Sequence, residues 1–216
     1  MTHPSKAKLF VSKLHLKFEN VGKKFYQRWL FRGVSHDFAE KPHLALVGTN
    51  GSGKSTLMRI IAGQLNPSEG KVQAAWEGKP LPLAQLYRHL SWAGPYLDLY
   101  PELTFREQVA LHFRLKACLL DSQEELIALL ELEPHQDKPL QWYSSGMLQR
   151  AKVGLALFTR SHLLLLDEPT SNMDQHNANR ILDLIARYTK NRLWVLASNL
   201  PREYERLDEA IYLSGK

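Results

Sequence analysis

Residues 48–56, GTNGSGKST, have the types and spacing of a phosphate-binding loop, because they match G-x-x-x-x-G-K-[ST] between an apolar strand pattern and a helical pattern. Glycines let successive backbone N–H groups turn toward phosphate oxygens, Lys54 brings a positive charge to the β- and γ-phosphates, and Ser55 brings a hydroxyl to Mg²⁺. The start of the following helix adds partial positive charge. The predicted nucleoside triphosphate site comprises Gly48, Thr49, Asn50, Gly51, Ser52, Gly53, Lys54, Ser55 and Thr56. A glycine-rich turn without a ligand is the plainer interpretation.

A second stretch, LLLLDEP at 163–169, combines four leucines with two acids and a proline. The leucines predict a strand buried on both faces, and burying an unpaired charge beside it is costly. Ligands of parallel sheets lie beyond the carboxyl ends of the strands. We therefore expect Asp167 near the Mg²⁺ held by Ser55, through a water, and Glu168 facing the water that attacks the γ-phosphate, as general base or water-orienter. An acidic cap on the next turn would explain one acid but not the strand.

A third stretch, YSSGMLQR at 143–150, places two serines and a glycine at a helix start about twenty residues before the acidic strand. The hydroxyls and backbone N–H groups of Ser144, Ser145 and Gly146 suit a second anion site. Within one chain, this helix start is expected to lie too far from the glycine loop to serve the same nucleotide, which calls for a second copy of the protein. Taken alone, the stretch fits an N-capped helix equally well.

The elements that position these stretches alternate between strand and helix patterns at both ends of the chain, which predicts a parallel sheet with crossover helices. The middle, at 103–132, has a helical pattern, with Thr104 as N-cap, Glu107 as its capping-box partner, and Asp121 or Ser122 capping a second helix. We expect one domain over 1–216 with a helical subdomain inserted at about 82–155. The expected strands are 8–18, 33–38, 43–48, 71–78, 163–166, 192–198 and 209–213, and the expected helices include 57–64, 145–160, 175–190 and 201–207.

The composition is that of an ordinary globular protein, with 44% hydrophobic and 23% charged residues in 216. The sequence has no apolar run of the roughly 18 residues that cross a bilayer and no apolar signal peptide. A single cysteine, Cys118, excludes an internal disulfide, fits a reducing cytosol and is expected on a helix face. The net charge of +6 comes from scattered cations, including Arg187, Lys190 and Arg192, which we interpret as solvated surface in preference to a nucleic-acid face.

At these motifs the chain resembles the ATP-binding-cassette (ABC) ATPase family over nearly its whole length. GTNGSGKST resembles the Walker A loop, and LLLLDEP resembles the Walker B strand with its catalytic glutamate, Glu168. YSSGM, which ends at Met147, resembles the signature usually written LSGGQ. TSNMD, which ends at Asp174, resembles the D-loop. Phe25 or Tyr26, in VGKKFY, occupies the place of the aromatic residue that stacks on adenine, although packing in an edge strand explains either residue as well.

The resemblance implies an α/β P-loop NTPase of ABC type, with a mostly parallel sheet core, a small N-terminal antiparallel β part and a helical subdomain. It implies an ATPase that uses ATP and Mg²⁺ and dimerises head to tail, as a homodimer or with a second ABC subunit. Two ATP molecules would lie between Walker A of one subunit and the signature of the other. Such a subunit drives integral membrane subunits from the cytoplasmic face of the membrane, as a peripheral protein, and nucleic acid is not an expected partner.

Three departures from the family pattern bear on this expectation. Pro95 and Tyr96 stand where a Q-loop glutamine is usual, and Asn199 stands at the switch histidine. Asparagine can donate to a γ-phosphate but cannot carry a proton, which puts the rate or control of hydrolysis in question. The signature also has Ser145 and Met147 in place of glycine and glutamine. The catalytic core of Walker A and Walker B residues is intact, so we expect an active ATPase.

Other classes of protein fit the motifs less well. Soluble ABC machines of the ribosome usually carry two cassettes, and those of chromosomes insert a long coiled coil, whereas fewer than about a hundred residues without sustained heptads separate the motifs here. A GTPase would require an Asn/Thr-Lys-x-Asp element, which the sequence lacks. A slow, ATP-gated regulatory protein is the main alternative, and Asn199 and the missing Q-loop glutamine motivate it.

Overall fold

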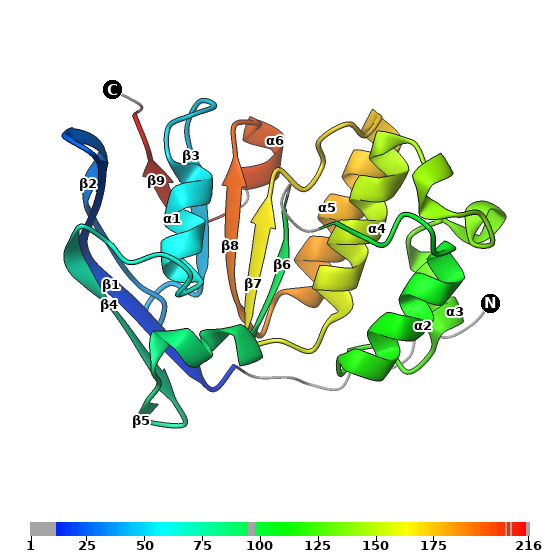
Figure 1. Cartoon of the computed structure of the whole chain (residues 1–216), viewed down its shortest axis with the longest axis horizontal. Coiled ribbons are helices and arrows are strands. Elements are labelled where there is room, and N and C mark those ends of the chain that lie inside the picture. The colour runs from blue at the N-terminus through cyan, green and yellow to red at the C-terminus, as the bar shows by residue number, and fades with distance from the viewer. Residues whose placement is uncertain (1–11, 95–97, 206, 208, 215–216) are drawn as a thin grey trace. The chain divides into compact units, whose positions relative to one another are not determined.

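The chain folds into two compact units, drawn in Figure 1. A computed structural model describes residues 12–94, 98–205, 207 and 209–214. What we call the sheet unit consists of Val11–Leu90, Ser161–Glu168 and Arg192–Lys216, and the helical unit contains Ser91–Arg160 and Pro169–Asn191. The boundary at residue 90 falls inside β6 (Leu90–Ala93), and another falls directly after Glu168. Expectations for Pro95 and Tyr96 concern positions outside the described residues.

The centre of the sheet unit is a set of parallel strands in the order β7-β8-β3-β9. These strands are β3 (His43–Val47), β7 (Leu163–Asp167), β8 (Leu193–Ser198) and β9 (Ala210–Tyr212). The four leucines of β7 are fully buried, which confirms the predicted strand with two covered faces. The register pairs Asp167 with Ala197 and Val47 with Ser198, so the carboxyl ends of three strands meet at one edge of the sheet.

An antiparallel sheet in the order β2-β1-β4-β5 completes the sheet unit. It contains β1 (Leu14–Phe25), β2 (Arg28–Asp37), β4 (Glu69–Trp76) and β5 (Lys79–Pro80). The first strand was predicted at 8–18, of which 8–11 lie outside the described residues, and it continues to Phe25 through irregular register around Asn20. The second strand begins five residues before the predicted start, because Arg28 pairs with Phe25 across a tight hairpin.

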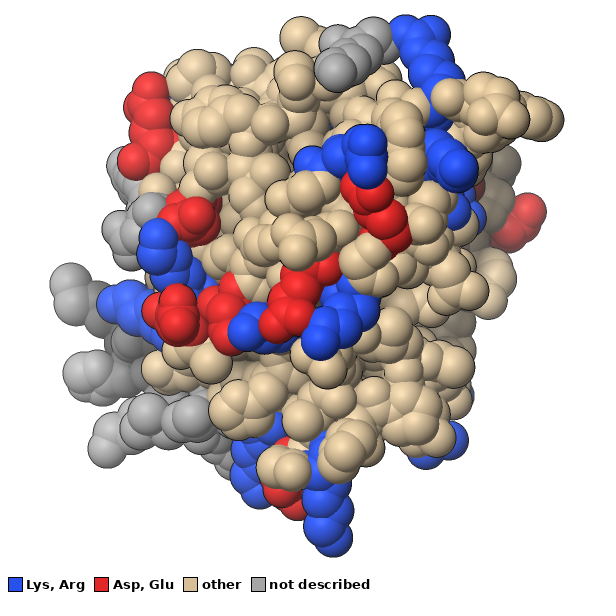
Figure 2. Space-filling view, turned by 90° about the vertical axis from the view of Figure 1, so that its left-hand side faces the viewer, with Lys and Arg blue, Asp and Glu red and all other residues tan. Residues whose placement is uncertain are grey.

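Acidic and basic side chains alternate in a band on the side of the molecule shown in Figure 2. Ion pairs on the antiparallel sheet join Lys17 and Lys71 to Glu19 and join Arg32 to Glu69.

One cation that was expected on the surface, Arg192, does not lie there. Arg192 is buried, with 2% of its surface exposed, and its Nη1 donates to Ser161 Oγ at 3.3 Å. The prediction of a solvated Arg192 was wrong, because the residue is buried and bonds to the chain before β7.

The helices follow their predicted starting signals closely. The sheet unit contains α1 (Lys54–Ile61), η1 (Leu83–Arg88) and α6 (Pro201–Tyr204), and the helical unit contains α2 (Phe105–Leu115), α3 (Gln123–Leu129), η2 (Glu133–His135), η3 (Leu140–Trp142), α4 (Ser145–Phe158) and α5 (Gln175–Tyr188). Thr104 and Glu107 form the predicted capping box of α2, and Ser122, one of two proposed caps, begins α3. No helix in the described part of the chain has the length and apolar character to span a membrane.

The helical pattern predicted over 103–132 is interrupted at 116–122, which is not helical and has an extended backbone at Lys116 and Ser122. Leu119 N–H donates to Phe158 O, and Arg160 N–H donates to Ala117 O, so pairing with the chain after α4 replaces helix continuation. Cys118 therefore lies in a loop that bridges to Thr159, and its expected place on a helix face was wrong. Burial raises the pKa of the Cys118 thiol to about 11, which keeps it protonated and unreactive at neutral pH.

Candidate functional site

The N-terminus of α1 is the feature that most clearly suits an anion. The first N–H groups of any helix have no acceptor inside the helix and are usually satisfied by a capping side chain. Among described helices of seven residues or more, α2, α3, α4 and α5 each have a side-chain cap, and α1 has none. The N-cap of α1 is Gly53, which follows the glycine loop. Its uncapped N–H groups and helix dipole can bind phosphate oxygens.

Two glycines of this loop are required by close packing. Gly53 has φ of 104°, and a Cβ there would lie 2.9 Å from side-chain atoms of both Leu30 and Phe31. At Gly48, a Cβ would lie 2.4 Å from Leu213 O and 2.5 Å from Ser52 Oγ. Strand β2 and the residue that follows β9 therefore contact the loop closely, and only hydrogen atoms fit at the points of contact. The loop conformation is set by the packing of the sheet unit.

The ammonium group of Lys54 is held above the loop that precedes it. Lys54 is 6% exposed, and its Nζ donates to Gly48 O at 2.7 Å and to Thr49 O at 3.2 Å. Ser52 Oγ is buried and has no hydrogen-bond partner among the described residues. A buried polar atom without a partner is costly, and an incoming phosphate oxygen would satisfy it. The loop thus places a fixed positive charge and a spare donor beside the uncapped helix start.

Ser55 and Asp167, the two predicted metal ligands, are in direct contact. Ser55 Oγ donates to Asp167 Oδ2 at 2.7 Å, and Asp167 is 4% exposed. Burial raises the pKa of the Asp167 carboxyl, an effect that the hydroxyl of Ser55 and the charge of Lys54 oppose. Oxygen ligands of this kind are those that Mg²⁺ prefers, and a cation here would offset the cost of burying the carboxylate. The residue pair therefore fits the magnesium ion that the sequence predicts.

Glu168 and Asn199 lie just beyond the carboxyl ends of adjacent strands. Glu168 has φ of 48°, a left-handed conformation that is costly for a residue with a side chain and is often found at functional sites. Its N–H donates to Ala197 O at 2.8 Å. Asn199 is exposed and follows Ser198, whose buried Oγ accepts the N–H of Leu200 at 2.9 Å. Ser198, which orders this turn, was not singled out from the sequence because a single serine gives no motif.

Phe25 and Tyr26 lie at the β1–β2 hairpin and are not packed in a core. Phe25 is 48% exposed and Tyr26 is 98% exposed, with φ of 53° at Tyr26. The ammonium of Lys23 lies 5.3 Å from the centre of the Phe25 ring. Of the two interpretations left open for these residues, edge-strand packing is therefore wrong. Both rings remain available to a ligand.

The signature segment, residues 143–147, begins α4 in the helical unit. Ser144 is the N-cap, and its Oγ accepts the N–H of Met147 at 3.2 Å. Ser145 is exposed, which explains why a serine fits where the family usually has glycine. At Gly146, in contrast, a Cβ would lie 2.5 Å from Asn172 O. The second glycine of the pattern is thus required by contact with the backbone that leads to Asp174.

Asp174 begins α5 as its N-cap. Its Oδ1 accepts the N–H of Asn177 at 2.8 Å, and its Oδ2 accepts the side-chain amide of the same residue at 2.6 Å. Arg150 Nη1 donates to Asn177 Oδ1 at 2.6 Å and to Leu130 O at 3.2 Å, which joins α4 to α5. Sequence reasoning missed Arg150 and Asn172. The φ of 60° at Asn172 is typical of asparagine in turns, but such a signal is weak.

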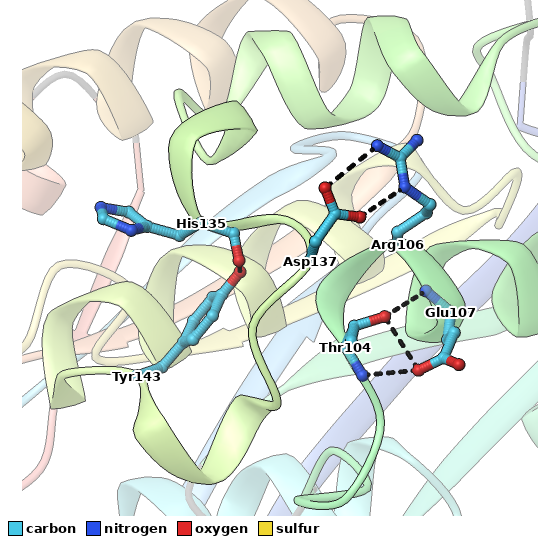
Figure 3. A network of polar contacts seen from close by, with 6 residues as sticks. All are labelled: Thr104, Arg106, Glu107, His135, Asp137 and Tyr143. Atoms are coloured by element: carbon cyan, nitrogen blue, oxygen red, sulfur yellow. Dashed lines mark hydrogen bonds and ion pairs between the residues drawn. The ribbon is translucent and has the colours of Figure 1, made fainter.

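A network of polar contacts supports the chain that leads into the signature segment (Figure 3). Tyr143 Oη donates to His135 O at 2.8 Å. Asp137, two residues further along, accepts from Arg106 Nε at 2.8 Å, and Arg106 belongs to the first turn of α2 beside the capping box. Burial raises the pKa of the Tyr143 hydroxyl to about 12, so it remains a donor at neutral pH. The signature segment is therefore anchored to α2.

The structure separates the predicted site residues into two groups. The sheet unit contains residues 48–56, Asp167, Glu168, Asn199 and the hairpin with Phe25 and Tyr26. The helical unit contains residues 144–147 and Asp174. A parallel sheet whose glycine loop opens an uncapped helix, with a buried acid bonded to the loop serine, defines a P-loop nucleotide-binding protein of the α/β class.

The comparison with protein families makes this class specific. The family model described as ABC transporter matches residues 31–171, and the chain belongs to that family. The expected fold and the expected class of enzyme, an ABC-type ATPase, are confirmed at the level of the family.

Individual relatives are consistent with this assignment. The chain is 31% identical over 196 residues to the lipoprotein-releasing system ATP-binding protein LolD of Legionella pneumophila, covering 85% of this chain and 86% of that protein. It is 32% identical over 184 residues to ATP-binding cassette sub-family A member 7 of Rattus norvegicus, covering 83% of this chain. That match covers 8% of the rat protein, and a match to mouse phospholipid-transporting ATPase ABCA3 covers 11%. The chain thus spans about a tenth of these longer relatives.

A solved structure has the same fold. The dimeric post-hydrolysis state of the ATP-binding cassette MJ0796, bound to ADP and Pi, superimposes with a TM-score of 0.75 at 23% identity. The match covers 92% of this chain and 94% of that chain.

Proposed function

We propose that this chain is the ATP-binding and ATP-hydrolysing subunit of a membrane ABC transporter. The observation that carries the proposal is the uncapped N-terminus of α1, with the buried Ser55–Asp167 pair at its first turn. This arrangement provides backbone donors for phosphate, a charge from Lys54 and two oxygen ligands for Mg²⁺. The proposed domain is single, over 1–216, with a helical subdomain at about 82–155.

Each residue at the loop has a distinct role in the proposed reaction. Backbone N–H groups of 48–56 and Lys54 Nζ bind the triphosphate, and Ser55 with Asp167 would hold Mg²⁺, which would neutralise part of the phosphate charge. Glu168 takes a proton from the attacking water as the oxygen of that water bonds to the γ-phosphorus. The bond between that phosphorus and the β–γ bridging oxygen breaks, which gives ADP and phosphate. Asn199 donates to a γ-phosphate oxygen.

A second copy completes the proposed site. The hydroxyls of Ser144 and Ser145, the backbone at Gly146, Met147 and the turn at Asp174 would face the nucleotide held by the partner. Two observations support this. These residues belong to a different compact unit from the glycine loop, and a cassette of the same fold is described as dimeric with ADP and Pi. The pairing is a homodimer or a dimer with a second ABC subunit.

The proposed membrane partners are integral transporter subunits at the cytoplasmic face of a membrane. The names of relatives support transport, because one belongs to a lipoprotein-releasing system and another is a Nod factor export ATP-binding protein. Co-purification with a polytopic membrane protein from native membranes tests this part of the proposal. A chain that is recovered alone from those membranes would contradict it.

The Glu168→Gln variant tests the enzymatic part. Purified wild-type chain is expected to release phosphate from Mg·ATP, and Glu168→Gln is expected to abolish release, because glutamine cannot accept the proton of water. ATP-dependent dimerisation, measured by light scattering, should persist in the variant. Glu102→Gln, at an exposed acid, is the matched control and should keep the wild-type rate. Rapid phosphate release that is unchanged in Glu168→Gln would mean that Glu168 has been misassigned.

A second function, an ATP-gated interaction switch with slow turnover, is favoured by Asn199 at the end of β8. An exposed amide at this point can bind phosphate but cannot relay a proton. This function predicts ATP-dependent dimerisation with phosphate release at the same low rate in wild type and Glu168→Gln. The experiment above therefore separates the two functions.

A further inference from the structure

Trp142 is an exposed aromatic residue directly before the signature segment. All five tryptophans lie in the described part of the chain, and Trp142 is the one classed as exposed, with 73% of its surface accessible. Tryptophan carries a large apolar surface that is normally covered, and tryptophans that remain exposed are enriched at binding sites. Trp142 ends η3, three residues before the first residue of α4.

The backbone around Trp142 is held on both sides. Trp142 N–H donates to Pro139 O at 3.0 Å, Gln141 N–H donates to Pro101 O at 2.9 Å, and Tyr143 N–H donates to Leu140 O at 3.0 Å. The neighbouring Tyr143 side chain is 7% exposed and bonds to His135 O. Because the backbone is fixed, the indole can contact a ligand with little loss of chain entropy. A fixed, exposed indole beside a proposed phosphate site is the observation that carries the inference.

We infer that Trp142 stacks on the nucleobase of the ATP that is bound to the glycine loop of the partner copy. This inference rests on the dimeric site of the proposed function. Two residues span at most about 7 Å between Ser144 and Trp142, and the indole extends the reach further. The distance between the terminal phosphate and the base of an extended ATP is comparable to the chain span and the reach of the indole taken together. Serine hydroxyls at 144–145 would thus face phosphate while Trp142 faces the base.

The chemistry of the two copies is complementary around the base. Phe25 and Tyr26, both exposed, belong to the sheet unit that contains the glycine loop, and Trp142 belongs to the helical unit. In the proposed dimer, one copy supplies a ring from its hairpin and the other copy supplies the indole, so the base has an aromatic residue on each face. Base–aromatic stacking tolerates any base, because every base has a π-face. Trp142 therefore contributes affinity for nucleotide that appears when the copies associate.

Fluorescence tests the contact directly. In a Glu168→Gln background, Mg·ATP is expected to quench tryptophan emission to the extent that the protein dimerises. The same protein with Trp142→Phe should still dimerise but should not show the quenching. The signal should depend on protein concentration, because the base is bound by the other copy. Quenching that is the same with and without Trp142 would overturn the inference.

Titration provides the second measurement. In the same background, Trp142→Ala is expected to raise the ATP concentration for half-maximal dimerisation about tenfold, within the range known for base stacking. Leu115→Ala, which alters another exposed apolar residue (70%) of the helical unit, should leave it unchanged. If Glu168→Gln never dimerises with ATP, the proposed function fails. If it dimerises and Trp142→Ala has the ATP dependence of its parent, the inference alone is wrong. If Trp142→Ala loses binding to a membrane partner but keeps the ATP dependence of its parent, the inference is also overturned.

Discussion

Without nucleotide, Asp167→Asn should be more stable than wild type. With nucleotide, it should be less stable than wild type. Asp167 is 4% exposed, and burial raises the pKa of its carboxyl. At neutral pH, where the carboxyl of the unfolded chain is ionised, folding therefore carries a free-energy cost at this group, because it must either bury the charge or take up a proton. Asparagine has a similar shape and can still accept the hydroxyl of Ser55, so we expect Asp167→Asn to gain about 1–2 kcal/mol in the free energy of unfolding.

The opposite effect is expected when nucleotide and metal are present. A ligand at 100 times its dissociation constant stabilises the folded wild type by about 2.7 kcal/mol. For a chain of this size each kcal/mol shifts the melting temperature by about 2–4 °C, so wild type should gain roughly 5–11 °C with Mg²⁺ and a slowly hydrolysed ATP analogue. Asp167→Asn should lose most of this gain, because it lacks the charged metal ligand. The two melting temperatures should therefore change order on adding ligand.

Differential scanning calorimetry at several pH values checks both parts of this prediction. Because the folded-state pKa of Asp167 is raised, its ionisation costs stability as the pH rises through that pKa. The advantage of the ligand-free variant should be largest at neutral pH and should disappear below the unfolded-state pKa. Glu102→Gln, at an exposed acid, is the control and should change stability by less than about 0.5 kcal/mol. A ligand-free variant that melts below wild type, or one that gains as much from ligand, would refute the reasoning.

Two further substitutions test the packing of the molecule. Gly53→Ala should lower the free energy of unfolding by about 1–3 kcal/mol more than the matched Gly78→Ala. Both glycines have positive φ, but an added Cβ would meet Leu30 and Phe31 at Gly53 and nothing at Gly78. Equal urea midpoints for the two variants would contradict this. Burial lowers the pKa of His112 from its usual value to about 4, so the unfolded chain binds an extra proton between about pH 6.5 and 4. Stability should fall by about 1–3 kcal/mol as the pH falls through that window, and His112→Gln should flatten this dependence in urea unfolding at pH 7 and pH 4.5; an unchanged slope would contradict the assignment.

Local signals explain most of what could be predicted from the sequence. The capping box of Thr104 and Glu107 depends on two residues that lie three positions apart. The helix start at Ser122 depends on one side chain and the first turn of the helix. The leucine run of β7 predicts burial on both faces because no polar residue interrupts it. Asp167 was expected near Ser55, with a magnesium ion and a water between them. The rule that ligands lie beyond the carboxyl ends of parallel strands made this nearness predictable, whereas the direct hydrogen bond between the two side chains was not predicted.

Features that depend on packing between distant segments could not be predicted. The helical pattern continues through Cys118, but hydrogen bonds to the chain after α4 prevail there. Arg192 looks like a surface cation in sequence but is buried and bonds to Ser161, in the segment before β7. Glu168 was assigned a chemical role from its place in the motif, but its left-handed backbone has no sequence signal, since glutamate rarely adopts that conformation.

The approach of Gly146 to Asn172 bears on the proposed dimer. Because no side chain separates the two backbones, the first turn of α4 and the turn before α5 form a common rigid edge. Arg150 and Asn177 reinforce this edge one turn further into each helix. In the proposed dimer, displacing one segment is therefore expected to displace the other as well. Substitutions in the two segments are expected to have non-additive effects on dimerisation, because the segments act as one surface.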